Sequence, residues 1–361
     1  MAGISHKGIL NKDAEFTVKN GAKVTFNKNA GIDFENGAKV KLGKDAKIDV
    51  DQSIAIGNAV SAKNNSVAVG NGAEAKGANG IAIGHESLSD YRGWGVAVGG
   101  NTQAIGTYSV ALGQTAKVLE YEGIAIGHTS LSEGSGAIAI GKSTNAKGTA
   151  SLAFGNDAKA LEQASIAFGQ GSNSNGNASI AVGRLAKATG ANSIAIGNQA
   201  VAAKEDSVVI GAHTYNKTTG IGVTGVGQQT QVLGDYSTAF GKAASANQSF
   251  TSAIGSSAKA TADCANAFGS NSTASAAWSV ALGTNSVADR TSGYVGLYAP
   301  EDTNSLTWKA NGGAVSVGSN GSLTRQIINV AAGTEDTDAV NVAQLKNAGW
   351  NLSTGKEITN P

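Results

Sequence analysis

The chain has 361 residues, a net charge of +1 and 15% charged residues, so nothing in it predicts an electrostatic grip on nucleic acid or a membrane surface. Glycine accounts for 50 residues without a three-residue period, which excludes collagen. The single cysteine, Cys264, excludes an internal disulfide, and no apolar run reaches the length of about eighteen residues that a membrane helix needs. The first residues lack the features of a signal peptide, so we expect a soluble protein or an excised piece of a longer one.

Residues 14–50 repeat with a period of eight. Each unit begins at an alanine and then carries apolar side chains at alternate positions, as in Phe16 and Val18. Such alternation is typical of strands, and Asn-Gly pairs such as the one at 20–21 are turn signals. The sequence therefore predicts an N-terminal β-strand module over residues 1–51, with a lysine-rich polar face that we interpret as solvated surface.

The pattern small–aliphatic–Ala–aliphatic–Gly occurs sixteen times between residues 52 and 283, mostly fourteen residues apart. The first copy is Ser-Ile-Ala-Ile-Gly at 53–57 and the last is Ser-Val-Ala-Leu-Gly at 279–283. A short, fixed period over this length is typical of a solenoid, in which each repeat stacks on the one before it. We therefore predict an all-β fold, a parallel β-roll of 14-residue coils, over residues 52–283.

Each coil is expected to contain two short strands. Alternation puts the aliphatic second and fourth residues of the pentapeptide on one face and the third residue on the other. The residues three and five positions beyond the closing glycine are small, as at Ala158 and Ala160. We predict that they form a second strand whose small side chains face the large ones of the first. The closing glycine suits a sharp corner with positive φ.

The third residue of the pentapeptide is alanine in fifteen of the sixteen copies, with Val209 as the exception. Alanine is a poor strand residue, so we interpret this face as lying against another surface. A two-strand coil also has too thin a core to be stable alone, which favours identical chains packed side by side with cyclic symmetry. The competing interpretation is that alanine merely fills the strand. The alanines predicted to pack in a trimer are Ala55, Ala68, Ala82, Ala97, Ala111, Ala125, Ala139, Ala153, Ala167, Ala181 and Ala195.

The regular repeat has three irregularities and then fades. The coil at 85–99 is one residue longer than the period, the coil at 58–70 is one residue shorter, and the stretch 212–241 contains one degenerate coil at 220–227. Residues 284–323 depart from the period, and we predict an irregular extension of the roll that holds one last coil around the related pentapeptide at 314–318.

Residues 324–347 are nearly free of glycine and predict a short helical neck. Thr337 or Asp338 suits a helix N-cap, and apolar residues three positions apart follow on one face. The segment has the character of the start of a coiled coil. Residues 348–361 contain glycine again, and we interpret them as the truncated start of a further module.

No constellation of residues predicts catalysis. His85 and His128 occupy equivalent corners three coils apart, about 14 Å at the spacing of neighbouring strands, which is too far to share a metal ion. His6 and His213 are isolated, and the glycine-rich stretch at 220–227 lacks the following helix that a phosphate site needs. We therefore predict no catalytic, metal-binding or cofactor-binding residues, and a protein that is not an enzyme.

Four aromatic residues share one register, at or just before the corner that precedes the pentapeptide. They are Trp94, Tyr108, Tyr236 and Trp278. Exposed aromatic side chains beside Arg92 are candidates for contact hot spots. The competing interpretation is that these rings cover the corners of the coils.

The repeats of the form Asn-Ser-(Ile/Val)-Ala-(Ile/Val)-Gly, as at 65–70 and 192–197, resemble the YadA-like head repeats of trimeric autotransporter adhesins. Residues 325–346 resemble the neck of that family. The resemblance covers roughly residues 52–347. It implies a homotrimer of left-handed parallel β-rolls, joined through the neck to a coiled-coil stalk and an anchor in the outer membrane of a Gram-negative bacterium. Signal peptide, stalk and anchor are missing, so we expect an extracellular fragment that meets a membrane only through the absent anchor.

The resemblance also implies adhesion to host matrix such as collagen, to host cells or to other bacteria, without nucleic acid as a partner. The alternative is a structural spacer fibre with no ligand of its own. A solenoid enzyme is disfavoured by the period of fourteen, and an ice-binding solenoid by the lack of a Thr-x-Thr ladder. The candidate adhesion residues are Asn65, Ser66, Asn192, Ser193, Tyr91, Arg92 and Trp94.

Overall fold

The computed structural model describes residues 53–90, 92–216, 220–300 and 303–347, together with the backbone of short strands before and after them. The chain forms two units, Met1–Ser53 and Ile54–Pro361.

The first unit contains short strands that pair in parallel. β1 lies opposite β3 with Gly8 beside Ile32, and β2 lies opposite β4 with Glu15 beside Lys39. Both pairs therefore join residues three eight-residue periods apart. The turns predicted at the Asn-Gly pairs and the lysine-rich face lie outside the described residues. The four strands are β1 (Gly8–Leu10), β2 (Glu15–Thr17), β3 (Ile32–Phe34) and β4 (Lys39–Lys41).

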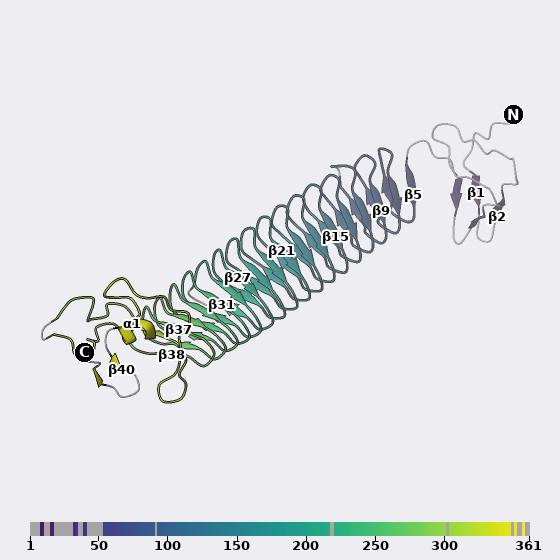
Figure 1. Ribbon diagram of the computed structural model, residues 1–361. Coiled ribbons are helices and arrows are strands. Elements are labelled where there is room, and N and C mark those ends of the chain that lie inside the picture. The colour runs from purple at the N-terminus through teal and green to yellow at the C-terminus, as the bar shows by residue number, and fades with distance from the viewer. Residues whose placement is uncertain are drawn as a thin grey trace. The chain divides into compact units, whose positions relative to one another are not determined.

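The second unit is dominated by a roll in which each coil contributes one strand to each of two parallel ladders (Figure 1). Strands of the first ladder come from the pentapeptide, and equivalent residues of successive coils lie side by side, as Ala97, Ala111 and Ala125 do. Strands of the second ladder begin four residues beyond the closing glycine. The predicted all-β parallel solenoid is confirmed.

The first ladder consists of β5 (Ile54–Ile56), β7 (Val67–Val69), β9 (Ile81–Ile83), β11 (Val96–Val98), β13 (Val110–Leu112), β15 (Ile124–Ile126), β17 (Ile138–Ile140), β19 (Leu152–Phe154), β21 (Ile166–Phe168), β23 (Ile180–Val182), β25 (Ile194–Ile196), β27 (Val208–Ile210), β29 (Thr224–Val226), β31 (Thr238–Phe240), β33 (Ser252–Ile254), β35 (Asn266–Phe268), β37 (Val280–Leu282) and β39 (Val315–Ser316). The second consists of β6 (Ser61–Ala62), β8 (Glu74–Ala75), β10 (Leu88–Ser89), β12 (Gln103–Ala104), β14 (Lys117–Val118), β16 (Leu131–Ser132), β18 (Asn145–Ala146), β20 (Lys159–Ala160), β22 (Asn173–Ser174), β24 (Lys187–Ala188), β26 (Val201–Ala202), β28 (Tyr215–Asn216), β30 (Gln231–Val232), β32 (Ser245–Ala246), β34 (Lys259–Ala260), β36 (Thr273–Ala274) and β38 (Val287–Ala288).

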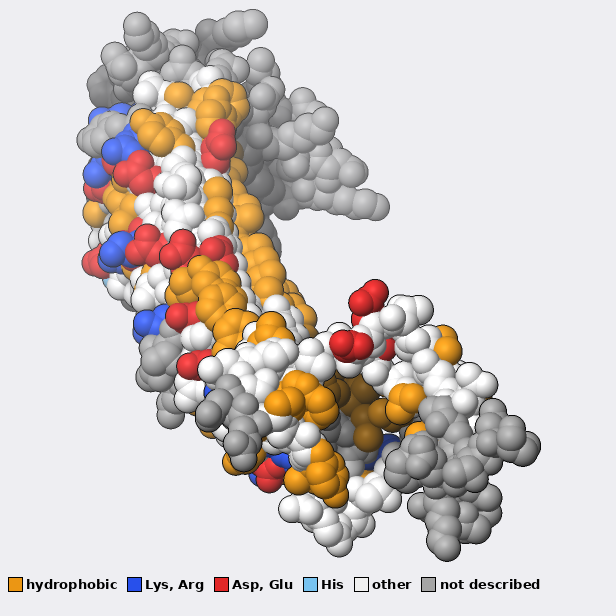
Figure 2. All heavy atoms as spheres, turned by 60° about the vertical axis from the view of Figure 1, so that its left-hand side comes forward, with side chains coloured by type: hydrophobic (Ala, Val, Ile, Leu, Met, Phe, Trp, Pro, Cys, Tyr) orange, Lys and Arg blue, Asp and Glu red, His pale blue; other side chains and the backbone are white. Residues whose placement is uncertain are grey.

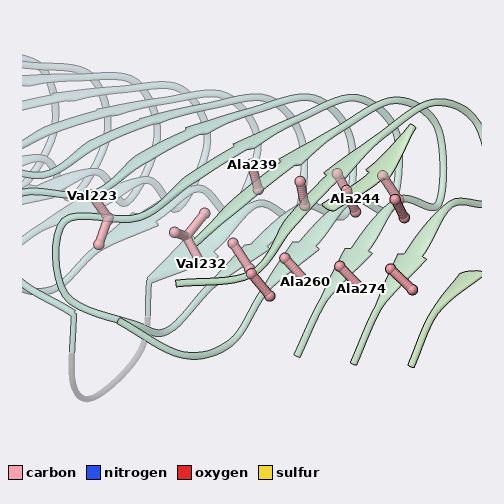
Figure 3. Close-up of a cluster of buried hydrophobic side chains, with 13 residues drawn as sticks. Val223, Val232, Ala239, Ala244, Ala260 and Ala274 are labelled. Atoms are coloured by element: carbon pink, nitrogen blue, oxygen red, sulfur yellow. The ribbon is translucent and has the colours of Figure 1, made fainter. Parts of the chain in front are cut away.

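The interior of the roll is filled almost entirely by methyl and hydroxyl groups. The third pentapeptide residue points inward from the first ladder, and the small residues beyond the closing glycine point inward from the second. Ala239 and Ala244 illustrate the two positions, both with 0% of their surface exposed. Figure 3 shows such short side chains from the two layers of strands lying between them. Small residues therefore face small residues, and the predicted pairing of large side chains with small ones is wrong.

Each coil turns two corners with residues in the left-handed region. One is the second residue after the closing glycine, and the other is the residue directly before the pentapeptide, as at Tyr108 (φ 57°). We call the second set the corner column. Inside the corners, serine and threonine hydroxyls donate to backbone carbonyls, as Ser130 Oγ does to the carbonyl oxygen of Gly127 at 3.0 Å. These bonds satisfy backbone acceptors that a thin, dry interior would otherwise leave unpaired.

The degenerate coil predicted around 220–227 is a complete rung. β29 pairs with β27 and with β31, and Gly227 takes the closing position with φ 135°. Gly225 replaces the inward alanine, and Val232 fills the space, because a Cβ on Gly225 would lie 2.9 Å from a methyl carbon of Val232. The buried Asn216 side chain donates to the carbonyl oxygen of Gly220 at 2.7 Å and so fixes the returning chain.

The roll ends in an excursion of the chain and a last rung. After β38 the chain leaves the roll and returns at β39, which pairs with β37. The guanidinium of Arg325 donates to Ser286 Oγ at 2.9 Å and to the carbonyl oxygen of Thr284 at 2.5 Å, so it covers the end of the last regular coil. The helix of the predicted neck is confined to α1 (Val342–Asn347), and β40 (Trp350–Asn351) pairs antiparallel with β41 (Lys356–Glu357).

Candidate adhesive surface

The outward side of the first ladder is an apolar stripe. The second and fourth residues of each pentapeptide point away from the interior, and we call these two rows, from β5 to β37, the aliphatic stripe. Its fourth-position row includes Ile83, Phe154, Phe168 and Ile210, all exposed. Figure 2 shows a band of hydrophobic side chains along the roll. A contiguous apolar patch of this length on one chain marks a surface that contacts another molecule.

The second-position row of the stripe becomes polar toward the C-terminal end of the roll. Thr224, Thr238, Ser252 and Asn266 follow one another in register where earlier coils have isoleucine, leucine or valine. Val280 restores the aliphatic residue in the next coil. The apolar part of the stripe is therefore narrower over these four coils.

Ten of the eleven alanines predicted to pack between chains lie inside the roll. From Ala68 to Ala195 every one of them is fully buried within a single chain, and only Ala55, in the first coil, is exposed. The assignment of these ten buried alanines to the trimer contact is wrong, because a side chain enclosed between its own two ladders cannot touch a second copy, whereas the assignment of Ala55 stays a prediction. Sequence reasoning missed the aliphatic stripe. The signal was present in Phe154 and Phe168, whose rings are too large for an interior lined by alanine.

The Asn-Ser pairs divide between the surface and the interior. Ser66 and Ser193 are buried, and their hydroxyls donate to Ala75 and Gly190 carbonyl oxygens at 3.1 and 2.7 Å. They are therefore not adhesion residues, because they close the turn from within. Asn65 and Asn192 are exposed in the corner column with φ of 64° and 54°.

Arg92 and Trp94 lie on the long coil that sequence reasoning singled out. Trp94 stands beside Tyr108 of the next coil, with ring centroids 6.0 Å apart. The guanidinium carbon of Arg92 lies 5.7 Å from the ring centroid of Tyr121, and Nη1 lies 3.7 Å from Glu120 Oε2. These residues of three consecutive coils form one exposed cluster. Tyr91, the remaining candidate, lies outside the described residues.

The other aromatic residues of the shared register also lie in the corner column. Tyr236 and Trp278 are exposed, and Tyr236 stacks with Phe250, with ring centroids 5.7 Å apart. Sequence reasoning missed Phe250, although it precedes its pentapeptide in the same register. The shared position directly before the pentapeptide was the signal that could have identified Phe250.

The described part of the chain can also be checked for metal sites and for membrane-spanning helices. His85, His128 and His213 are exposed at coil corners, and no three potential metal ligands lie together there. His6 lies outside that part. Within the same residues, no helix is both long and apolar enough to cross a membrane.

Comparison with known proteins matched two family models. The model described as "Coiled stalk of trimeric autotransporter adhesin" matches residues 326–360. The model described as "YadA head domain repeat (2 copies)" covers more than half of the chain, at residues 62–87, 95–116, 121–144, 146–172, 162–186, 188–214, 219–244, 233–258 and 267–286.

Individual relatives are similar over parts of the chain. Autotransporter adhesin BadA of Bartonella henselae is 55% identical over 67 residues, which are 16% of this chain and 2% of that protein. The crystal structure of the collagen-binding domain of the Yersinia adhesin YadA is 26% identical, with a TM-score of 0.21, and the match covers 68% of this chain and 84% of that one. The matches to the head repeats, which cover more than half of the chain, assign the family: the chain belongs to the trimeric autotransporter adhesins with YadA-type heads.

Proposed function

We propose that the chain is the head of a bacterial surface adhesin. It assembles as a homotrimer and attaches the cell to host extracellular matrix of the collagen type, to host cells or to other bacteria. In the full-length protein it is held at the cell surface by an outer-membrane anchor. The observation that carries the proposal is the aliphatic stripe, an apolar surface that runs from coil to coil on the outside of the roll.

The stripe favours assembly because a contact between chains removes its apolar side chains from water. Rows of isoleucine, valine and phenylalanine run from coil to coil, and burying apolar surface contributes about 25 cal/mol per Å². Three copies related by a threefold axis bring the same rows of each chain together. The third-position alanines support this contact from beneath, since they keep the two ladders close and the stripe regular.

Adhesion requires a surface that remains outside such an assembly. The corner column and the outward side of the second ladder carry polar side chains, among them Asn65, Asn192, Lys159 and Lys187, at least partly exposed. Their repetition along the roll and in three chains provides many weak contacts, which together give a high avidity. This arrangement suits attachment to a repetitive matrix better than recognition of one small ligand.

Two measurements on the purified chain test the proposal. Sedimentation equilibrium should give a particle of three chains. Fibrillar collagen should retain that particle saturably, and retention should fall several-fold when Asn65 and Asn192 are both replaced by alanine. A stable single chain would contradict the assembly. Absence of saturable binding to collagen, to cells and to other matrix proteins would favour the alternative, a spacer fibre with no ligand.

A further inference from the structure

A second group of aromatic side chains in the corner column has no part in the proposed trimer contact or in the proposed collagen-binding residues. Tyr236 and Phe250 belong to neighbouring coils, and Trp278 lies two coils further on. All three rings are more than half exposed, and Trp278 is the most exposed of them at 69%. We call these three residues the distal aromatic run.

The fold does not require rings at these positions. Tyr236, Phe250 and Trp278 have φ of 52°, 59° and 62°, a region that bulky residues rarely adopt. Elsewhere the same column holds alanine with the same backbone, as at Ala150 and Ala164 with φ of 55° and 53°. Rings that remain mostly in water also gain little from burial. Strained, exposed aromatic residues therefore point to a contact with another molecule.

Two carboxylates accompany the distal aromatic run. Asp235 directly precedes Tyr236, and Asp263 lies in the coil between Phe250 and Trp278. Two rungs separate the carboxylates, about 10 Å along the roll. Neither forms an ion pair with any side chain in the described ranges, although Asp235 Oδ1 accepts a hydrogen bond from the backbone N–H of Ile221 at 3.0 Å.

The same corner of the roll shows how such a surface takes a cation. At Tyr121, the guanidinium of Arg92 lies 5.7 Å from the ring centroid and 3.7 Å from a carboxylate oxygen of Glu120. Ring and carboxylate together suit arginine, because the flat guanidinium stacks on an aromatic face and still pairs with an anion. The distal aromatic run has the ring and the carboxylate, and among the described residues no arginine is stacked on its rings or paired with Asp235 or Asp263.

We propose that the distal aromatic run binds an extended, basic segment of a partner protein. Its arginine or lysine side chains lie against Tyr236, Phe250 and Trp278 and pair with Asp235 and Asp263. Carboxylates beside the rings exclude nucleic acid, whose phosphates they would repel. The inference goes beyond the proposed function by giving the chemistry of a partner, and it rests on that function only because this corner must stay outside the assembly.

A labelled fifteen-residue peptide with arginine at every third position tests the site by fluorescence anisotropy on the assembled protein. We expect saturable binding that weakens with added salt. Replacing arginine by neutral citrulline should weaken binding at least about tenfold, because the charge is lost and the shape kept. The triple variant Tyr236→Ala, Phe250→Ala and Trp278→Ala should weaken it at least about fivefold, and Asp263→Asn should weaken it in the same direction.

Asn79→Ala is the matched control, since Asn79 lies exposed in the same column with φ 57°, carries no ring and is not one of the candidate adhesion residues. The alanine variants should fold, because alanine already occupies this column in other coils. Equal binding by the triple variant or equal binding of the citrulline peptide would each overturn the proposal. Particle mass and collagen retention are measured on the same preparations, so a failed assembly is distinguished from a failed peptide site.

Discussion

Phe154 and Phe168 stack face to face on the outside of the roll, with ring centroids 4.8 Å apart and planes 5° apart. They are the fourth residues of consecutive pentapeptides and lie opposite each other in β19 and β21. Directly before them in the chain, Ala153 and Ala167 point inward and are fully buried. The pair therefore fixes which side of the first ladder is the interior and which side is available to another chain.

Replacing both Phe154 and Phe168 by lysine should dissociate the proposed trimer and leave the roll folded. Two charged side chains per protomer would be buried without partners in the contact, while the interior alanines remain unchanged. Sedimentation equilibrium measures the loss of assembly, and circular dichroism checks the strand content. The matched control reverses charge on the second ladder with Lys159→Glu and Lys187→Glu, and these variants should keep the mass of the unmodified protein. A double-lysine variant that still assembles would show that the stripe is not the contact.

Ala125→Leu should destabilise the roll itself. Ala125 is fully enclosed, and the larger side chain would push the two ladders apart. Overpacking of this kind costs typically about 1–3 kcal/mol. Thermal unfolding followed by circular dichroism should show a lower midpoint for this variant. Ile126→Leu, one residue further on and facing outward, should leave the midpoint nearly unchanged, and equal midpoints for both variants would contradict the assignment of faces.

The closing glycines should tolerate no side chain. Gly127 has φ 128°, and a Cβ there would lie 2.4 Å from the carbonyl oxygen of Gly141 in the next coil. Gly127→Ala should therefore lower the free energy of unfolding by about 1–3 kcal/mol. Gly136 provides the comparison, since its φ is 65° and nothing lies within 4 Å of the added Cβ. Chemical denaturation should find Gly136→Ala close to the unmodified protein, and a similar loss at both sites would refute the steric explanation.

The repeat period was enough to predict the fold, but not the direction of its side chains. Alternation separates Ala125 from Ile124 and Ile126 without saying which face is inside. That choice depends on how closely the two ladders approach, a tertiary quantity that local pattern does not contain. The inward direction of Ser193 was hidden for the same reason, because its partner carbonyls belong to the turn and to the second ladder. The rung at Gly225 was recognisable, since its closing glycine keeps the register of the column.

Arg325→Ala should loosen the C-terminal end of the roll. The guanidinium donates to the carbonyl oxygens of Thr284 and Val317 and to Ser286 Oγ, in place of the backbone of a further coil. Without it these acceptors lose a charge-assisted donor. Hydrogen exchange should become faster at Ser286 and Val287 and remain unchanged in the middle of the roll. Arg325→Lys should not restore protection, because a single ammonium group cannot reach the three acceptors together. Full protection in the lysine variant would contradict this geometry.

The loop before α1 should respond to acid through Asp338. Backbone N–H groups of Thr334 and Glu335 donate to its carboxylate at 2.8 and 3.1 Å, and these bonds hold the pKa of Asp338 below its ordinary value. A lowered pKa means that the folded loop prefers the charged form. Its contribution to stability is therefore complete above the ordinary aspartate pKa of about 3.9 and is lost as the pH falls through the lower, folded-state value. NMR titration should show the amide signals of Thr334 and Glu335 shifting together with Asp338 below about pH 4. Asp338→Asn should abolish that shift, and amide signals that titrate near pH 6 would assign the transition to another group.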